Sequence, residues 1–110
     1  MKPLIWLGSS RADLKRFPVK ARRVAGFQLW RVQLGFEPSD WKPMHTVGPG
    51  VREIRIRTGV DHRVLYVAKF EEGIYVLHGF EKRSQKAARR DVKIATNRFS
   101  QLVAERHRKE

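Results

Sequence analysis

Basic side chains recur through residues 51–84 at positions where strands usually carry Thr, Ser or paired Lys and Glu. These side chains belong to Arg52, Arg55, Arg57, Arg63, His78, Lys82 and Arg83. A guanidinium group binds phosphate oxygens through planar, paired hydrogen bonds, and an imidazole exchanges protons near neutral pH. Because one short segment collects both kinds of group, we expect it to bind a phosphate backbone and to carry the function of the chain.

These residue types suit the cleavage of a phosphodiester by the neighbouring ribose 2′-hydroxyl. The reaction needs a base for the 2′ proton, an acid for the 5′ leaving oxygen and cations for the pentacoordinate phosphorane. The candidates for the cations are Arg55, Arg57 and Arg63. His78 is a candidate for the acid or the base, Tyr66 can orient the substrate, and Phe80 can stack on a nucleobase.

Each of these residues also has an ordinary structural role open to it. Two arginines that alternate along a strand are often a solvated face, and Glu53 can serve only to neutralise Arg55. Tyr66 and Phe80 fit a hydrophobic core, and a single histidine in a strand is often structural. The residue types therefore favour phosphate binding, and they leave the acid and the base open.

Three strands must position these residues. The segment contains three runs of alternating apolar and polar residues, separated by turns at Thr58–Asp61 and Glu71–Gly73. The cross-strand pairs that we predict are Arg57 with His62, Glu53 with Tyr66, Phe70 with Ile74, Tyr66 with His78 and Val64 with Phe80. This register predicts that one face carries Glu53, Arg55, Tyr66 and His78. Arg63 has the other parity and joins this face only if a bulge or the turn rotates it.

The rest of the chain supplies helices around this meander. The elements that we predict are a strand at Pro3–Leu7, a helix at about Arg11–Arg16, a helix at about Pro18–Leu34 that stops at Gly35, a loop at Glu37–Gly50, and a helix after Ser84 with a frayed tail at His107–Glu110. We therefore expect an α+β fold in one domain.

The composition describes a basic, folded domain. The chain has 110 residues, 41% of them hydrophobic, and a net charge of +13, which predicts a polyanionic partner, with nucleic acid ahead of an acidic protein or a membrane surface. It has no cysteine, and its histidines and acidic residues lack ligand-like spacing, so we expect neither a metal nor another cofactor. No apolar run approaches the length of a membrane span, and we expect a cytoplasmic protein without a membrane partner.

Three segments carry a resemblance to a known family: VGPGVREIRIR, the Arg63–Tyr66 strand and LHGFEKRSQK. Over about residues 2–104 the chain resembles the RelE/HigB branch of the RelE/ParE toxin superfamily, and within it the phage-derived, RelE-like toxins of type II toxin–antitoxin systems. The resemblance implies a microbial RNase-like fold, with a small antiparallel sheet, two N-terminal helices on one face and a C-terminal helix. It also implies a cognate antitoxin, typically of the helix-turn-helix type, and cleavage of mRNA at the ribosomal A site through the 2′-hydroxyl without metal.

The resemblance also implies roles for single residues. The family's basic strand positions match Arg55 and Arg57, and its strand arginine matches Arg63. Its basic pair after the last strand matches Lys82 and Arg83. Some relatives have lysine where this chain has Glu53, so the base is either Glu53 or His78.

Our leading hypothesis is a ribosome-dependent mRNA endoribonuclease that an antitoxin neutralises. Its candidate catalytic residues are Glu53, Arg55, Arg57, Arg63, His78 and Lys82, and its candidate RNA-binding residues are Arg52, Tyr66, Phe80 and Arg83. One alternative is a ParE-like toxin that inhibits DNA gyrase and cleaves nothing. A second alternative is a basic nucleic-acid-binding module without catalysis.

Overall fold

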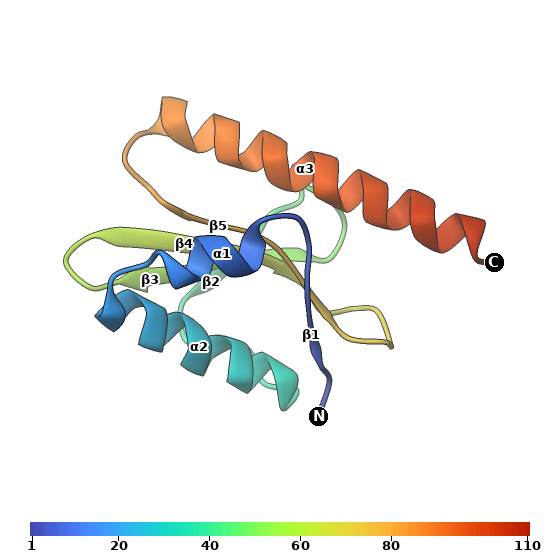
Figure 1. Cartoon of the computed structure of the whole chain (residues 1–110), viewed down its shortest axis with the longest axis horizontal. Coiled ribbons are helices and arrows are strands. Elements are labelled where there is room, and N and C mark those ends of the chain that lie inside the picture. Colours follow the sequence, from blue (N-terminus) through green and yellow to red (C-terminus); the bar gives the residue numbers. More distant parts are fainter.

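A five-stranded sheet separates two N-terminal helices from one long C-terminal helix in the computed structural model, which describes residues 1–110 (Figure 1). The elements in chain order are β1 (Leu4–Trp6), α1 (Ser10–Lys15), α2 (Val19–Gln33), β2 (Trp41–Pro43), β3 (Val51–Arg57), β4 (Asp61–Val67), β5 (Ile74–Glu81) and α3 (Gln85–Arg108). The strand order across the sheet is β1-β5-β4-β3-β2. The predicted α+β class is confirmed, and β3, β4 and β5 form the predicted antiparallel meander.

Both edge strands add something that the sequence did not predict. The predicted first strand is present as β1, but it runs parallel to β5, so the sheet is mixed. β2 lies within the predicted loop and pairs with β3, placing Lys42 opposite Glu53. A strand of three residues is too short to show an alternating pattern, which is why it resembled a loop. Pro43 is tolerated there because an edge strand does not need every backbone donor.

The helices α1 and α2 pack on one face of the sheet, as predicted. Ala21, Ala25 and Leu29 of α2 are at most 1% exposed and pack against Ile54 and its neighbours in β3 and β4. Their spacing of about one helical turn is what places them on one side of the helix. The helix ends where predicted, because Gly35 adopts a φ of +93° that other residues rarely take.

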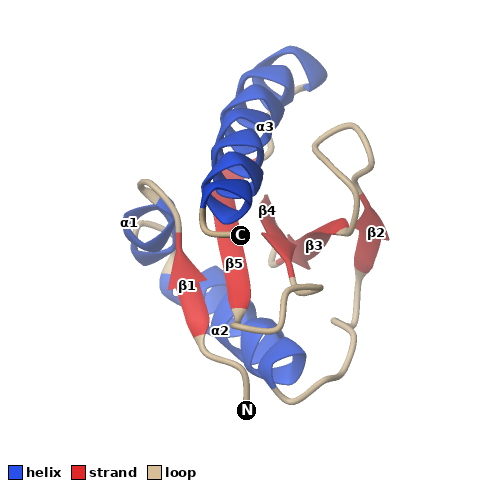
Figure 2. Ribbon diagram, turned by 90° about the vertical axis from the view of Figure 1, so that its right-hand side faces the viewer, coloured by secondary structure: helices blue, strands red, loops and turns tan.

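The long helix α3 covers part of the opposite face. Ala95, Phe99 and Leu102 pack against Leu65 and Leu77 of the sheet, and Figure 2 shows α3 and α2 on opposite sides of it. The helix continues to Arg108, so the predicted frayed tail at residues 107–110 is wrong for its first half. The basic residues of its last turn interact favourably with the helix dipole, and an ion pair of 2.6 Å joins Glu105 to Arg108. None of the helices has the length and apolar content that crossing a membrane requires.

The predicted register between β3 and β4 is wrong by one residue. Arg57 pairs with Asp61 rather than His62, because the turn between the strands holds one residue fewer than predicted. Consequently Arg55 lies opposite Arg63, and Glu53 lies opposite Leu65. A shift of one residue moves a side chain to the other face of the sheet. Arg63 therefore lies on the same face as Glu53 and Arg55, whereas the predicted register placed it on the opposite face.

The register between β4 and β5 is also different from the prediction. Leu65 pairs with His78 but Tyr66 pairs with Val76, so Leu77 is an extra residue in a β-bulge. Neither the pairing of Tyr66 with His78 nor that of Val64 with Phe80 occurs. Tyr66 instead packs in the core beneath α1 and α2, on the face opposite Glu53.

Candidate functional site

One buried carboxylate lies among three cationic side chains on the α3 face of the sheet. Glu53 is 5% exposed, and its Oε1 lies 3.3 Å from Nε of Arg63, 3.8 Å from Nε of Arg55 and 3.9 Å from Nζ of Lys42. We call these four residues the arginine cluster. Within the cluster one buried carboxylate faces three cations, and the more exposed carboxylates of Asp40 and Asp61 offset part of this positive charge from the edge. The positive charge that remains is favourable for an incoming anion.

Several donors of the arginine cluster lack hydrogen-bond partners. Nε and Nη1 of Arg63 and Nε of Arg55 are buried and donate no hydrogen bond. The two Nε atoms approach Oε1 of Glu53 as ion pairs, and that oxygen accepts no hydrogen bond either. Buried polar groups in folded proteins are almost always paired, so unpaired guanidinium donors are unusual. Phosphate oxygens are suitable acceptors for them because they accept charge-assisted hydrogen bonds from the planar guanidinium fork.

The outer edge of the arginine cluster is open and weakly paired. Arg57 is about 58% exposed at its side chain, and its Nε lies 3.1 Å from Asp40, which also approaches Arg55 at 3.9 Å. Asp61 approaches Arg63 at 3.9 Å. Exposed ion pairs of this kind contribute little to stability, so an anion can displace the carboxylates at low cost.

Lys42 and Asp40 are parts of this site that the sequence did not predict. Both lie in or beside β2, within the segment assigned to a loop. Asp40 and Lys42 are two residues apart, which places them on the same side of an extended chain, but this spacing alone does not indicate a strand.

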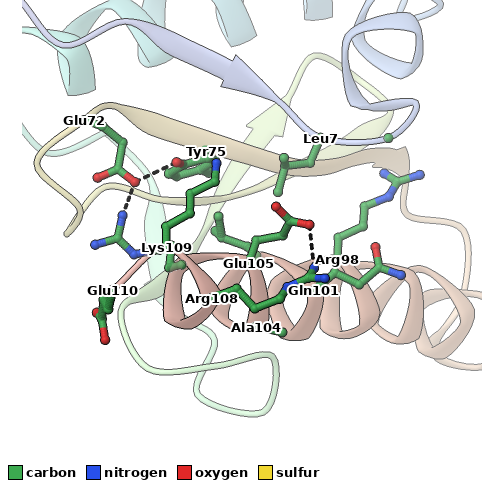
Figure 3. Close-up of a pocket in the computed structure, with 13 residues that line it drawn as sticks. Leu7, Glu72, Tyr75, Arg98, Gln101, Ala104, Glu105, Arg108, Lys109 and Glu110 are labelled. Atoms are coloured by element: carbon green, nitrogen blue, oxygen red, sulfur yellow. Dashed lines mark hydrogen bonds and ion pairs between the residues drawn. The ribbon is translucent and has the colours of Figure 1, made fainter.

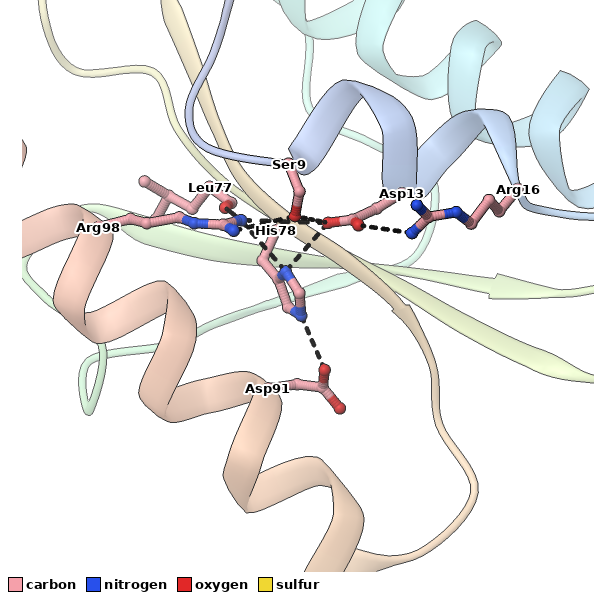
Figure 4. A network of polar contacts seen from close by, with 7 residues as sticks. All are labelled: Ser9, Asp13, Arg16, Leu77, His78, Asp91 and Arg98. Atoms are coloured by element: carbon pink, nitrogen blue, oxygen red, sulfur yellow. Dashed lines mark hydrogen bonds and ion pairs between the residues drawn. The ribbon is translucent and has the colours of Figure 1, made fainter.

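His78 lies in a different polar network, in which both ring nitrogens have partners (Figure 4). Its Nε2 lies 2.7 Å from Asp91 of α3, and its Nδ1 lies 3.2 Å from Asp13 of α1. Arg98 lies 3.3 Å from Nδ1 and donates to the carbonyl of Leu77 at 2.7 Å. The imidazole is 6% exposed and connects both helical layers to β5, so its geometry is that of a structural link.

Phe80 separates this network from the arginine cluster. It lies opposite Arg63 on the neighbouring strand, and its ring stacks on that of His78 with 5.5 Å between the centroids. Because Phe80 is 8% exposed and belongs to the core beneath α3, it offers little surface on which a nucleobase could stack.

Tyr66 and Arg52 lie away from the cluster, on the other face of the sheet. Tyr66 is 1% exposed, and burial raises the pKa of its hydroxyl, an effect that nearby Arg52 partly opposes. The guanidinium of Arg52 lies 4.1 Å from the ring centroid of Trp41. The predicted position of Tyr66 beside Glu53 is therefore wrong.

The basic pair after β5 lies beside the turn between β3 and β4. The backbone amide of Lys82 donates to the carbonyl of Asp61 at 2.8 Å, which brings Lys82 close to that edge of the cluster. Arg83 points into solvent, with 76% of its side chain exposed, and contacts Glu81 at 3.3 Å. Both residues are therefore free to contact a long polyanion.

A hollow of about 890 Å³ lies at the opposite end of β5 (Figure 3). It is lined by the C-terminal half of α3 and by residues near Leu7. At its rim the hydroxyl of Tyr75 donates to Glu72 at 2.7 Å, and Arg106 pairs with the same carboxylate. The hydrogen bond from Tyr75, one from the backbone and the contact with Arg106 lower the pKa of Glu72 to about 2. These polar groups satisfy one another, and none belongs to the arginine cluster.

The sequence places the chain in a family. The profile of the family described as phage derived protein Gp49-like (DUF891) matches residues 12–100, a span that runs from α1 through most of α3. No curated protein matches the sequence. The matched span includes the arginine cluster and the whole network around His78 except Ser9. The chain therefore belongs to the Gp49-like, phage-derived protein family, which is related to the RelE-like toxins.

Proposed function

We propose that the chain is the toxin of a type II toxin–antitoxin system and that it cleaves mRNA on the ribosome. Membership of the Gp49-like family supports the toxin class. The observation that carries the cleavage step is the arginine cluster, in which buried guanidinium donors of Arg63 and Arg55 lack partners. Such donors are preorganised to stabilise charge that develops on phosphate oxygens, and this effect is usually the largest single contribution to catalysis.

The proposed reaction is attack of a ribose 2′-oxygen on the adjacent phosphorus. A bond forms between the 2′-oxygen and phosphorus, the bond from phosphorus to the 5′-oxygen breaks, and the products are a 2′,3′-cyclic phosphate and a 5′-hydroxyl. The 2′-hydroxyl loses one proton and the 5′-oxygen gains one, so no proton is consumed overall. In this reaction Arg55, Arg57 and Lys42 bind the non-bridging oxygens at the surface, while Arg63 donates from beneath them.

Glu53 and His78 act as positioning residues in this proposal. The carboxylate of Glu53 orients Arg63 and Arg55, from 3.3 Å and 3.8 Å, and its position beneath the cations leaves it little access to a 2′-hydroxyl. Both nitrogens of His78 are engaged by carboxylates, so the imidazole has no free nitrogen for a substrate. Lys82 and Arg83 extend the phosphate-binding surface from the cluster along the RNA.

The remaining parts of the proposal concern partners. A net charge of +13 suits a chain that binds ribosomal RNA and mRNA in the cytoplasm. The same charge suits neutralisation by an antitoxin with an acidic contact surface.

The test is to induce the chain in bacteria and to map RNA ends by primer extension. The wild-type chain should arrest growth and produce stops within translated codons. Arg63→Lys keeps the charge but loses the guanidinium fork, and it should reduce cleavage about 100-fold; Arg63→Ala should reduce it by about 1,000-fold. Thermal melts of the purified variants control for folding.

Three results would contradict the proposal. Full cleavage by Arg63→Lys and Arg63→Ala would remove the cluster from the reaction. Growth arrest with altered DNA supercoiling and no new RNA ends would instead support the gyrase-inhibiting alternative, and RNA binding without either effect would support a non-catalytic module.

A further inference from the structure

The solvent side of α2 carries large apolar residues where a surface helix normally carries polar ones. Ala25, Leu29 and Val32 mark the side of the helix that packs on the sheet. Large apolar residues lie on the opposite side of the helix or directly after its end. Their exposed fractions are 52% for Val19, 52% for Phe27, 47% for Trp30, 41% for Leu34 and 58% for Phe36. We call these five residues the α2 stripe. A contiguous exposed apolar surface of this kind usually marks an interaction site.

The spacing of the α2 stripe follows one face of a helix. Phe27, Trp30 and Leu34 are separated by three and four residues, so they lie one above another. The rings of Phe27 and Trp30 are 6.0 Å apart between centroids. This is the arrangement by which one amphipathic helix receives another along its length.

The charged residues of α2 itself have one sign, and the first carboxylate after it is that of Glu37, next to Phe36. Between Val19 and Gln33 the helix contains Lys20, Arg22, Arg23 and Arg31 and no acidic residue. Arg23 lies four residues from both Val19 and Phe27, so its guanidinium emerges within the apolar surface rather than beside it. An occupant of this surface must therefore bring both apolar side chains and carboxylates.

Gly26 adds a shape requirement to the chemical one. It lies on the solvent side of α2 next to Phe27 and four residues before Trp30, and nothing lies within 4 Å of the position where a Cβ would be. A glycine inside a helix lowers helix stability by about 1 kcal/mol relative to alanine. Helix stability therefore does not explain the glycine at this position. It leaves a notch in which another backbone can approach closely.

We propose that the α2 stripe docks an acidic amphipathic helix of a partner protein. Identifying that partner as the antitoxin rests on the proposed function, whereas the chemistry of the helix rests on the surface alone. A second copy of the chain does not fit, because each copy would bring the same four cations and no carboxylate. A membrane surface does not fit either, because Arg23 would be placed among the acyl chains.

A partner on the α2 stripe would leave the arginine cluster uncovered. The helix α2 lies on one side of the sheet, while the arginine cluster lies on the side of α3 (Figure 2). A helix docked on the stripe therefore does not occupy the phosphate-binding surface. Variants in the stripe should accordingly weaken the partner without changing the activity of the chain alone.

The test measures binding of the protein encoded by the gene adjacent to that of this chain, by isothermal titration with the full-length chain. Phe27→Ser combined with Trp30→Ser should weaken binding about 100-fold, and Arg23→Glu should weaken it about tenfold. Val60→Ser is the matched apolar control, because Val60 is 47% exposed in the turn between β3 and β4. Lys93→Glu on α3 is the matched control for charge reversal. Both controls should change the dissociation constant less than about threefold.

Four results would overturn the inference. Two concern the partner: the double variant binds it with wild-type affinity, or the wild-type chain does not bind the adjacent gene's product at all. Two concern other occupants: the wild-type chain self-associates in sedimentation, or binds vesicles of neutral and anionic phospholipid, and the double variant abolishes that behaviour. Failure of the proposed function has a separate readout. It would be seen as an absence of growth arrest and of new RNA ends when the wild-type chain is expressed alone. The stripe variants should leave that readout unchanged.

Discussion

Two ionic networks lie side by side at the sheet, and they differ in how completely their buried polar atoms are paired. In the arginine cluster one carboxylate, that of Glu53, faces three cations. In the network around His78 one imidazole lies between the carboxylates of Asp13 and Asp91. Phe80 separates the two.

The difference between the networks lies in what each leaves unsatisfied. The arginine cluster retains unpaired buried donors, whereas both nitrogens of His78 have partners. An excess of donors and positive charge favours an external anion, and a closed set of partners favours rigidity. Arginine and histidine at strand positions look equivalent in the sequence. In the structure the arginines keep buried donors without hydrogen bonds, for which we propose a phosphate ligand, whereas the histidine links three layers.

The largest effect on stability should come from removing the imidazole of His78 from its network. His78→Ala removes the group that both carboxylates share and should lower the free energy of unfolding by about 3 kcal/mol, because Asp91 loses its 2.7 Å partner and Asp13 keeps only its contacts at the surface with Arg16, Arg98 and Ser9. Cleavage per folded molecule should stay within about threefold of wild type, since His78 is not in the arginine cluster. Denaturant melts and a cleavage assay on the same preparation measure the two quantities.

The control for this experiment is His45→Ala, because His45 is exposed and outside both networks. It should change the free energy of unfolding by less than about 0.5 kcal/mol. If His78→Ala folds normally but cleaves about 100-fold more slowly, the comparison fails and His78 belongs to the chemistry.

The sequence predicted the parts of this arrangement that depend on local patterns. Alternation along β3 places Glu53, Arg55 and Arg57 on one face whatever the neighbouring strand does, and this prediction is confirmed. The end of α2 at Gly35 and the start of α3 after Ser84, whose hydroxyl accepts from the amide of Ala87, depend on single residues with strong preferences.

The parts that the sequence did not predict depend on contacts between distant segments. One residue fewer in the turn before Asp61 moved Arg63 onto the face of Glu53, and a bulge at Leu77 altered the position of His78. No local pattern reports either change, because both are decided by how neighbouring strands pack. The partners of His78 come from the first and last helices, so no local pattern indicates that its nitrogens are occupied.

A smaller effect should come from the open edge of the arginine cluster. Arg57→Ala should reduce the slope of log affinity against log salt concentration by about 0.7 for a short single-stranded RNA, because one phosphate contact is lost. Stability should change little, since the side chain is 58% exposed. Lys15→Ala is the matched control, because Lys15 is an exposed cation on α1 that lies outside the cluster. Equal salt slopes for the two variants would mean that Arg57 does not contact the RNA backbone.

The smallest effect on stability should come from a change at Glu72. Its ion pair with Arg106 lies at the exposed rim of the hollow, unlike the two buried networks. The pKa of Glu72 is lowered from 4.5 to about 2, first by the hydroxyl of Tyr75 and then by the backbone and Arg106. Because its folded pKa lies below its unfolded pKa, the carboxylate stabilises the fold above pH 4.5, and this contribution is lost as the pH falls from 4.5 towards 2. Glu72→Gln should therefore remove a small, specific part of the acid sensitivity in that window and leave stability near neutral pH only slightly reduced. Carboxyl NMR titration of the wild-type chain measures the midpoint directly, and a midpoint near 4.5 would show that Tyr75 and Arg106 do not hold this carboxylate in solution.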